Sequence, residues 1–154
     1  MKGGAMAEIE TTVTIERPRE EVFGYFLALE ENVPKTNPDV EYVVKTPDGP
    51  TVVGTTLRSR GRSLGRVRET SMRFTAILPN EKIQFEAEVG PMRPRCVFTF
   101  DPTDGGTRVT FRGDPNPVGP FKVLSPLFAR MGRRVWAQRL TRAKVALEAS
   151  TPSL

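Results

Sequence analysis

Between residues 40 and 114 the chain alternates apolar and polar residues in six successive segments. Turn sequences rich in Pro, Gly, Asp and Asn separate these segments, which cover residues 40–46, 55–62, 66–78, 82–89, 95–100 and 107–113. A period of two is typical of strands, and such short connections join antiparallel neighbours. The pattern therefore predicts an antiparallel meander.

Other periodic segments flank this meander. Residues 8–16 alternate like a further half-buried strand, and residues 17–27 then change to a helical period. A second short helix or turn is expected around residues 29–38, and a long helix over residues 125–150. The sequence thus predicts one α+β domain, in which a curved antiparallel sheet of about seven strands grips the long C-terminal helix.

One face of the predicted C-terminal helix changes from small to large side chains along its length. The small residues of its first half are Ser125, Ala129 and Gly132, and large residues of its second half include Trp136, Leu140 and Leu147. Because protein interiors are densely packed, the small residues have two explanations. Either the helix approaches the sheet closely, or a cavity lies beside it.

Length and composition exclude several classes of site. The chain of 154 residues suits a single domain, expected over residues 7–150 after a tag-like or disordered tail over residues 1–6. One cysteine and no histidine exclude zinc sites and histidine-dependent triads, so we expect no metal and no cofactor. No apolar run is long enough to span a bilayer, and with a lone thiol a cytoplasmic location is expected.

Three stretches of the chain match a known family pattern, namely IERPREEVFGYF, ILPNEKIQF and FTFDPTDGGTRVTF. With the order of the elements, they resemble the SRPBCC or helix-grip superfamily, which includes birch-pollen-allergen-like proteins and START lipid-transfer domains. The bacterial polyketide cyclase/dehydrase-like branch is the most similar, over about residues 7–149. The resemblance implies a helix-grip fold: a curved seven-stranded antiparallel sheet, two short helices and a long C-terminal helix that enclose a ligand cavity.

The two periodicities also nominate side chains that face the core or the cavity. These candidate ligand contacts are Phe23, Phe26, Tyr42, Leu57, Met72, Phe74, Phe85, Phe98, Phe111, Met131 and Trp136. For each of these residues taken alone, a plain core role is favoured over a ligand contact. Together they predict an apolar concavity with few polar groups, which is the usual composition of a small-molecule site.

Residues 58–68 read RSRGRSLGRVR, with five arginines in eleven residues of a chain whose net charge is +5. Three interpretations are open: a solvated hairpin edge that discourages pairing between sheets, a cavity-rim site for a carboxylate or phosphate, and a nucleic-acid contact. The segment lacks interleaved aromatic residues for base stacking, and the chain lacks a base-reading helix or motif. The hairpin interpretation is therefore favoured over nucleic-acid binding.

The direction of Arg66 and Arg68 depends on the strand that follows them. In an unbroken strand both share a face with Phe74 and lie at the cavity rim, where they and Arg139 are candidate anion contacts. A β-bulge around residues 69–71 would turn them to solvent. We favour the solvent-facing arrangement, because Glu69 is the only carboxylate of this segment that could offset their charge.

The helix stripe and the resemblance together favour a binding module that holds a hydrophobic polyketide-, lipid- or quinone-like molecule between the sheet and the C-terminal helix. An alternative is a cyclase- or dehydratase-type enzyme without metal or cofactor, whose candidate proton-transfer groups are Tyr42 and Glu69. A nucleic-acid or ribosome partner of the arginine-rich hairpin is the third hypothesis. The sequence names neither the ligand nor the oligomeric state.

Overall fold

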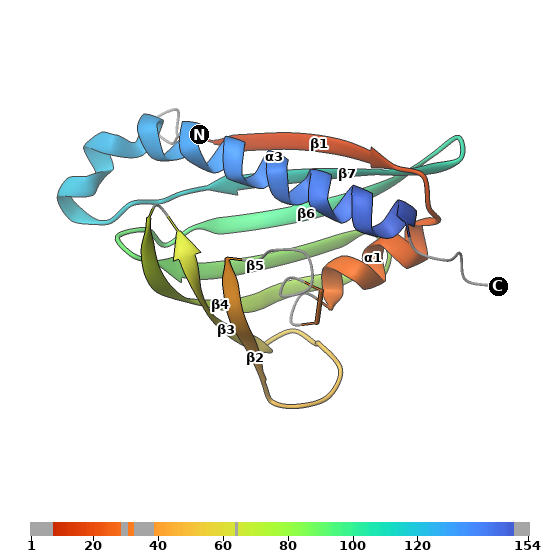
Figure 1. Ribbon diagram of the computed structural model, residues 1–154, viewed down its shortest axis with the longest axis horizontal. Helices are drawn as coiled ribbons and strands as arrows, with labels where there is room; N and C mark the ends of the chain where they lie inside the picture. Colours follow the sequence, from red (N-terminus) through yellow and green to blue (C-terminus); the bar gives the residue numbers. More distant parts are fainter. Residues whose placement is uncertain (1–7, 29–30, 33–38, 64, 150–154) are drawn as a thin grey trace.

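The computed structural model, in which residues 8–28, 31–32, 39–63 and 65–149 are described, is a curved sheet with a long helix across its concave face (Figure 1). The seven antiparallel strands are β1 (Ile9–Ile15), β2 (Val40–Thr46), β3 (Thr56–Ser63), β4 (Arg66–Leu78), β5 (Lys82–Val89), β6 (Arg95–Thr103) and β7 (Gly106–Asp114). Their order in the sheet is β1-β7-β6-β5-β4-β3-β2. The predicted α+β meander is confirmed, and β1 extends it by one edge strand that pairs with β7.

Two α-helices and one 3₁₀-helix complete the described chain. They are α1 (Arg19–Leu27), η1 (Gly119–Leu124) and the long α3 (Ser125–Ala149). The expected second helix over residues 29–38 falls largely outside the described residues, as does the expected tail over residues 1–6. None of the described helices combines the length and the apolar character needed to cross a membrane.

The tight turns of the meander depend on residues that tolerate a left-handed backbone. Asn80 has φ 63° between β4 and β5, and Gly105 has φ 88° between β6 and β7. Glycine and asparagine adopt this conformation at low cost, whereas most side chains clash with the backbone there. The PN and DGG sequences that predicted turns therefore fix the hairpins that align β4 with β5 and β6 with β7.

An aromatic cluster fills the end of the molecule at which α1 packs on the sheet. The ring of Phe23 on α1 lies 5.3 Å from that of Phe100, and the ring of Phe26 lies 4.9 Å from that of Phe98. Apolar residues along the second half of α3 are buried against the same region, namely Leu140, Ala143 and Leu147. This core holds one end of α3 to the sheet and leaves the opposite end less densely filled.

Two contacts fix α3 against β1. At Gly132 an added Cβ would collide with Cδ1 of Ile9, so the helix approaches the strand as closely as its backbone allows. Near its C-terminus, the Glu148 carboxylate accepts hydrogen bonds from the Lys144 ammonium (2.7 Å) and the Glu16 amide (2.8 Å). The Lys144 ammonium also donates to the Thr14 carbonyl at 2.8 Å. Close approach thus explains Gly132.

Candidate functional site

A partly open cavity of about 300 Å³ lies between the concave face of the sheet and α3. It extends from the aromatic cluster toward the first half of α3 and the tips of the central strands. Its lining comes from α1, α3 and every strand of the sheet. Both explanations of the small-to-large helix stripe meet at Gly132, which contacts Ile9 of β1 and also lines the cavity, whereas Ser125 and Ala129 lie outside the lining.

Eight of the eleven nominated ligand contacts line this cavity: Phe26, Leu57, Met72, Phe85, Phe98, Phe111, Met131 and Trp136. Two others, Phe23 and Phe74, belong to the packed core. Phe23 is directed at Phe100, and Phe74 is 1% exposed where a β-bulge begins in β4. Whether any of the eight touches a ligand stays a prediction.

Tyr42 does not line the cavity, contrary to its nomination. The pairing of β2 with β3 shifts between Val40 and Tyr42, and an irregularity of this kind exchanges the two faces of a strand. Val40 and Val43 consequently face the cavity, whereas Tyr42 is 37% exposed outside its lining. Tyr42 therefore cannot act on a molecule bound inside.

Arg68 faces the cavity, and the bulge expected at residues 69–71 is absent. Strand β4 keeps a regular register from Arg66 to Phe74 against its neighbours, so Arg68 shares the inner face with Met72 and lines the cavity. The expectation that Arg68 faces solvent was wrong. Arg66, the first residue of the strand, is exposed and lies outside the lining.

Glu69 projects from the opposite face of β4. Its side chain is 60% exposed and its carboxylate lies 3.7 Å from the Arg60 guanidinium, which is also 3.6 Å from the Glu41 carboxylate. Glu69 is thus part of a hairpin ion-pair network outside the cavity. Neither nominated proton-transfer group, Tyr42 or Glu69, reaches the cavity lining.

Three side chains stack in layers on the cavity wall: Phe111 of β7, and Trp136 and Arg139 of α3. The rings of Phe111 and Trp136 stack at 4.0 Å with an interplanar angle of 15°, and the Arg139 guanidinium lies 4.7 Å from the Trp136 ring centre. Such cation–π contacts stabilise a guanidinium over an indole. Arg139 keeps an exposed surface, but the surrounding protein removes part of the hydration of its guanidinium and lowers its pKa.

The lining residues that were not nominated from the sequence include three with ionisable side chains that the site brings together: Cys96, Asp114 and Arg142. Burial raises the pKa of the Cys96 thiol to about 12; the nearby charge of Arg139 lowers this pKa and that of Asp114 raises it. One Asp114 oxygen accepts a hydrogen bond from the Asn116 amide at 2.9 Å. The other oxygen is buried without a hydrogen-bond partner among the described residues.

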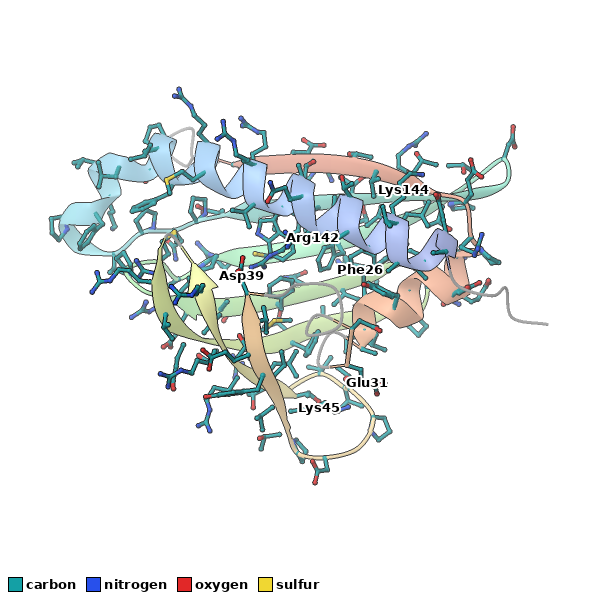
Figure 2. The ribbon with its side chains drawn as sticks, viewed as in Figure 1. Phe26, Glu31, Asp39, Lys45, Arg142 and Lys144 are labelled. Atoms are coloured by element: carbon teal, nitrogen blue, oxygen red, sulfur yellow. The ribbon has the colours of Figure 1, made fainter. Side chains whose placement is uncertain are left out.

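The sequence contained a usable signal for only one of these residues. Arg142 follows Arg139 by three positions, and residues with this spacing share one face of a helix. Figure 2 shows Arg142 and Lys144 on opposite sides of α3, with Lys144 on the side of β1. Asp114 ends β7 immediately before Pro115, where the chain leaves the sheet, so strand alternation does not predict its direction.

The described residues contain no group of three or more His, Cys, Asp or Glu side chains that could hold a metal ion. What the cavity offers instead is an aromatic wall, several guanidinium groups and one carboxylate. This arrangement can enclose an apolar molecule, donate hydrogen bonds to an acidic group and accept one at Asp114.

Several solved structures share the fold. A START superfamily protein from Mycobacterium smegmatis is 16% identical, with a TM-score of 0.76 over 94% of this chain and 99% of that chain. Ara h 8.0201 is 14% identical, with a TM-score of 0.75 over 93% and 98% of the two chains. The di-domain ARO/CYC StfQ from the steffimycin biosynthetic pathway is 16% identical, with a TM-score of 0.73 over 92% of this chain and 50% of that chain.

These similarities establish the fold, which is the helix-grip fold of START and birch-pollen-allergen-like proteins. No curated protein matches the chain. The sequence profile of the family described as polyketide cyclase / dehydrase and lipid transport matches residues 6–148. Since this match spans nearly the whole chain, the protein belongs to the polyketide cyclase / dehydrase and lipid transport family.

Proposed function

We propose that the protein is a single ligand-binding domain, over residues 7–150, that holds a hydrophobic small molecule of polyketide, lipid or quinone type. The observation that carries the proposal is the cavity of about 300 Å³ with its wall of aromatic and aliphatic side chains. Small-molecule sites are typically apolar concavities of roughly 300–1,000 Å³ with a few placed polar groups. The volume favours one compact molecule.

The family assignment supports the same class of ligand, because its description joins polyketide chemistry with lipid transport. The arginine-rich hairpin gives less support to a nucleic-acid partner, since Arg60 is paired with Glu41 and Glu69. The proposed location is the cytoplasm, where a lone thiol such as Cys96 stays reduced.

The test uses N-phenyl-1-naphthylamine, a neutral dye whose fluorescence increases in apolar surroundings, as the ligand probe. We expect saturable binding to the native protein and an increase in its melting temperature. Ala87 lines the cavity, and Ala87→Phe should fill the space and abolish binding. The matched control, Glu88→Phe, adds the same ring at an exposed position outside this lining and should bind the dye normally.

Absence of saturable binding to the native protein would overturn the proposal. So would equal binding by the Ala87→Phe and native proteins, because the dye would then occupy another surface. The melting temperatures of both phenylalanine variants in the absence of dye report whether each remains folded.

A second candidate function, a cofactor-free enzyme, is favoured by Asp114. This residue supplies the only carboxylate of the lining within the described part of the chain, and its second oxygen has no hydrogen-bond partner among the described residues. A carboxylate at an apolar cavity suits general-base catalysis. Asp114 thereby takes the role first assigned to Tyr42 and Glu69.

Base catalysis can be tested without the natural substrate by using 5-nitrobenzisoxazole. A general base removes the proton on its C3 atom, the N–O bond breaks, and a coloured cyanophenolate forms. We expect the native protein to accelerate this reaction and Asp114→Asn to lose the acceleration while still binding the neutral dye. No acceleration by the native protein, or an unchanged rate in Asp114→Asn, would remove Asp114 as a base.

A further inference from the structure

The charged residues of the cavity lining are mostly positive. Among the described residues it includes five arginines and a single acidic residue, Asp114; the arginines are Arg60, Arg62, Arg68, Arg139 and Arg142. Arg60 is already paired with Glu41 and Glu69. The two arginines of α3 differ from it in having no ion pair with any described residue.

Arg139 and Arg142 are close enough to influence each other. Removal of hydration by the surrounding protein lowers the pKa of Arg139, and the positive charge of Arg142 contributes in the same direction. Both side chains are positively charged guanidinium groups. The cavity therefore holds two like charges, three residues apart on one helix, that repel each other in reduced solvent.

Asp114 does not neutralise this pair. The charge of Asp114 raises the pKa of the Cys96 thiol, and the charge of Arg139 lowers it. The three groups are therefore neighbours. No ion pair joins Asp114 to Arg139, however, among the contacts of the described residues. The guanidinium of Arg139 loses part of its hydration without gaining an ion pair among the described residues, and an acidic ligand group would supply that pair.

We propose that the cavity selects an anionic aromatic ligand, whose carboxylate or phosphate binds Arg139 and Arg142 while its ring lies among the aromatic lining residues beside Trp136. Guanidinium groups match carboxylate and phosphate oxygens with paired hydrogen bonds. Phe111 and Arg139 cover the two faces of the Trp136 ring, so the apolar surface for the ligand comes from the edge of this ring and from neighbouring lining residues such as Phe85 and Phe98. The inference rests on the proposed binding function and specifies the chemistry of its ligand.

Two dyes with the same aromatic body test this inference. N-phenyl-1-naphthylamine is neutral, and 8-anilino-1-naphthalenesulfonate carries a sulfonate that stands in for the acidic group. We expect the native protein to bind the sulfonate at least about tenfold more tightly. Arg139→Gln should remove this preference and keep the affinity for the neutral dye. Arg142→Gln should likewise weaken binding of the sulfonate dye and keep that of the neutral dye.

Arg134→Gln is the matched control, because Arg134 is an exposed arginine of the same helix outside the cavity lining. It removes one positive charge and should leave the preference for the sulfonate intact. The melting temperature of each glutamine variant in the absence of dye shows whether it is folded; should Arg139→Gln fail this check, Arg139→Met, which keeps the volume of the stem, replaces it.

The outcomes separate the two proposals. Equal affinity for both dyes in the native protein, or equal loss of both in Arg139→Gln, would overturn the anion site and leave the hydrophobic cavity standing. Failure of the native protein to bind either dye would overturn the binding function and the anion site together. Displacement of the sulfonate by inorganic phosphate alone, at comparable concentration, would also count against an aromatic ligand.

Discussion

The Arg139 guanidinium carbon lies 4.7 Å from the centre of the Trp136 ring, and Trp136 is the only tryptophan of the chain. The positive charge of Arg139 therefore lies beside the indole, at the wall of a cavity that is partly open to solvent. Its fluorescence reports directly on the electrostatics of this wall.

We predict that iodide quenches Trp136 more strongly than caesium does. An anion is attracted to the Arg139 charge and a cation is repelled, and the partly closed cavity weakens screening by salt. Stern–Volmer constants measured at equal ionic strength check this, and Arg139→Gln should bring the two constants together. Equal quenching by both ions in the native protein, or no change relative to Arg134→Gln, would contradict the prediction.

Arg66 and Arg68 form a matched pair on β4, since only Arg68 lines the cavity. We predict that Arg68→Met strengthens binding of N-phenyl-1-naphthylamine by about 1 kcal/mol, because a charged wall becomes apolar. Arg66→Met should leave the affinity unchanged. Titration of the dye fluorescence measures both. An equal change in the two variants would mean that the effect comes from net charge.

Cys96 should make the protein less stable at alkaline pH. Burial raises the pKa of the folded thiol from 9.0 to about 12, so the folded state holds this proton more tightly than the unfolded chain. The stabilisation is complete below about pH 9 and is lost as pH rises toward 12, at about 1.4 kcal/mol per pH unit. Urea unfolding at several alkaline pH values checks this, and Cys96→Ala should flatten the dependence. An unchanged slope in that variant would refute the assignment.

Glu148 contributes stability with the opposite dependence on pH. The hydrogen bonds from the Lys144 side chain and the Glu16 amide hold the pKa of Glu148 below its ordinary value of 4.5. This contribution is present above pH 4.5 and disappears as pH falls through the lowered pKa. Glu148→Gln should therefore lower the melting temperature at neutral pH, and its difference from the native protein should vanish in acid. Glu81→Gln, on an exposed turn, is the control.

The contact of Gly132 with Ile9 predicts a coupled pair of substitutions. Gly132→Ala gains about 1 kcal/mol of helix propensity but places its Cβ against Cδ1 of Ile9. Ile9→Val removes that methyl group at a cost of about 0.5–1.5 kcal/mol. We expect Gly132→Ala to stabilise the protein more in the Ile9→Val background than in the native one, by about 1 kcal/mol. Additive effects in a double-mutant cycle would show that the contact carries no strain.

The sequence predicts the fold well because each strand carries its own period-two pattern. The expected bounds of β2, β4 and β5 coincide with those of the structure, and α3 begins at Ser125 as expected. These are local properties, and the short turns restrict how neighbouring strands pair. Most of the aromatic cavity wall follows from the same alternation.

The polar part of the site was harder to predict, because it depends on register and on strand ends. A shift in β2 turns Tyr42 away from the cavity, and the regular pairing of β4 turns Arg68 toward it. Neither is visible in the alternation of a single strand, since a bulge depends on the fit between two backbones. Asp114 lies where β7 ends and the alternation no longer applies.

Helix α3 rests on two fixed points, Gly132 over Ile9 and Glu148 at the corner between β1 and α1. The residues proposed to select the ligand, Trp136, Arg139 and Arg142, all lie between these points on the span they support. We expect an exchange of Arg139 or Arg142 to alter which ligand the cavity binds, while the contacts of Gly132 and Glu148 keep the helix in place. The contacts that hold α3 on the sheet are thus separate from the arginines proposed to bind the ligand. Single substitutions at those arginines can therefore change ligand preference while the fold stays the same.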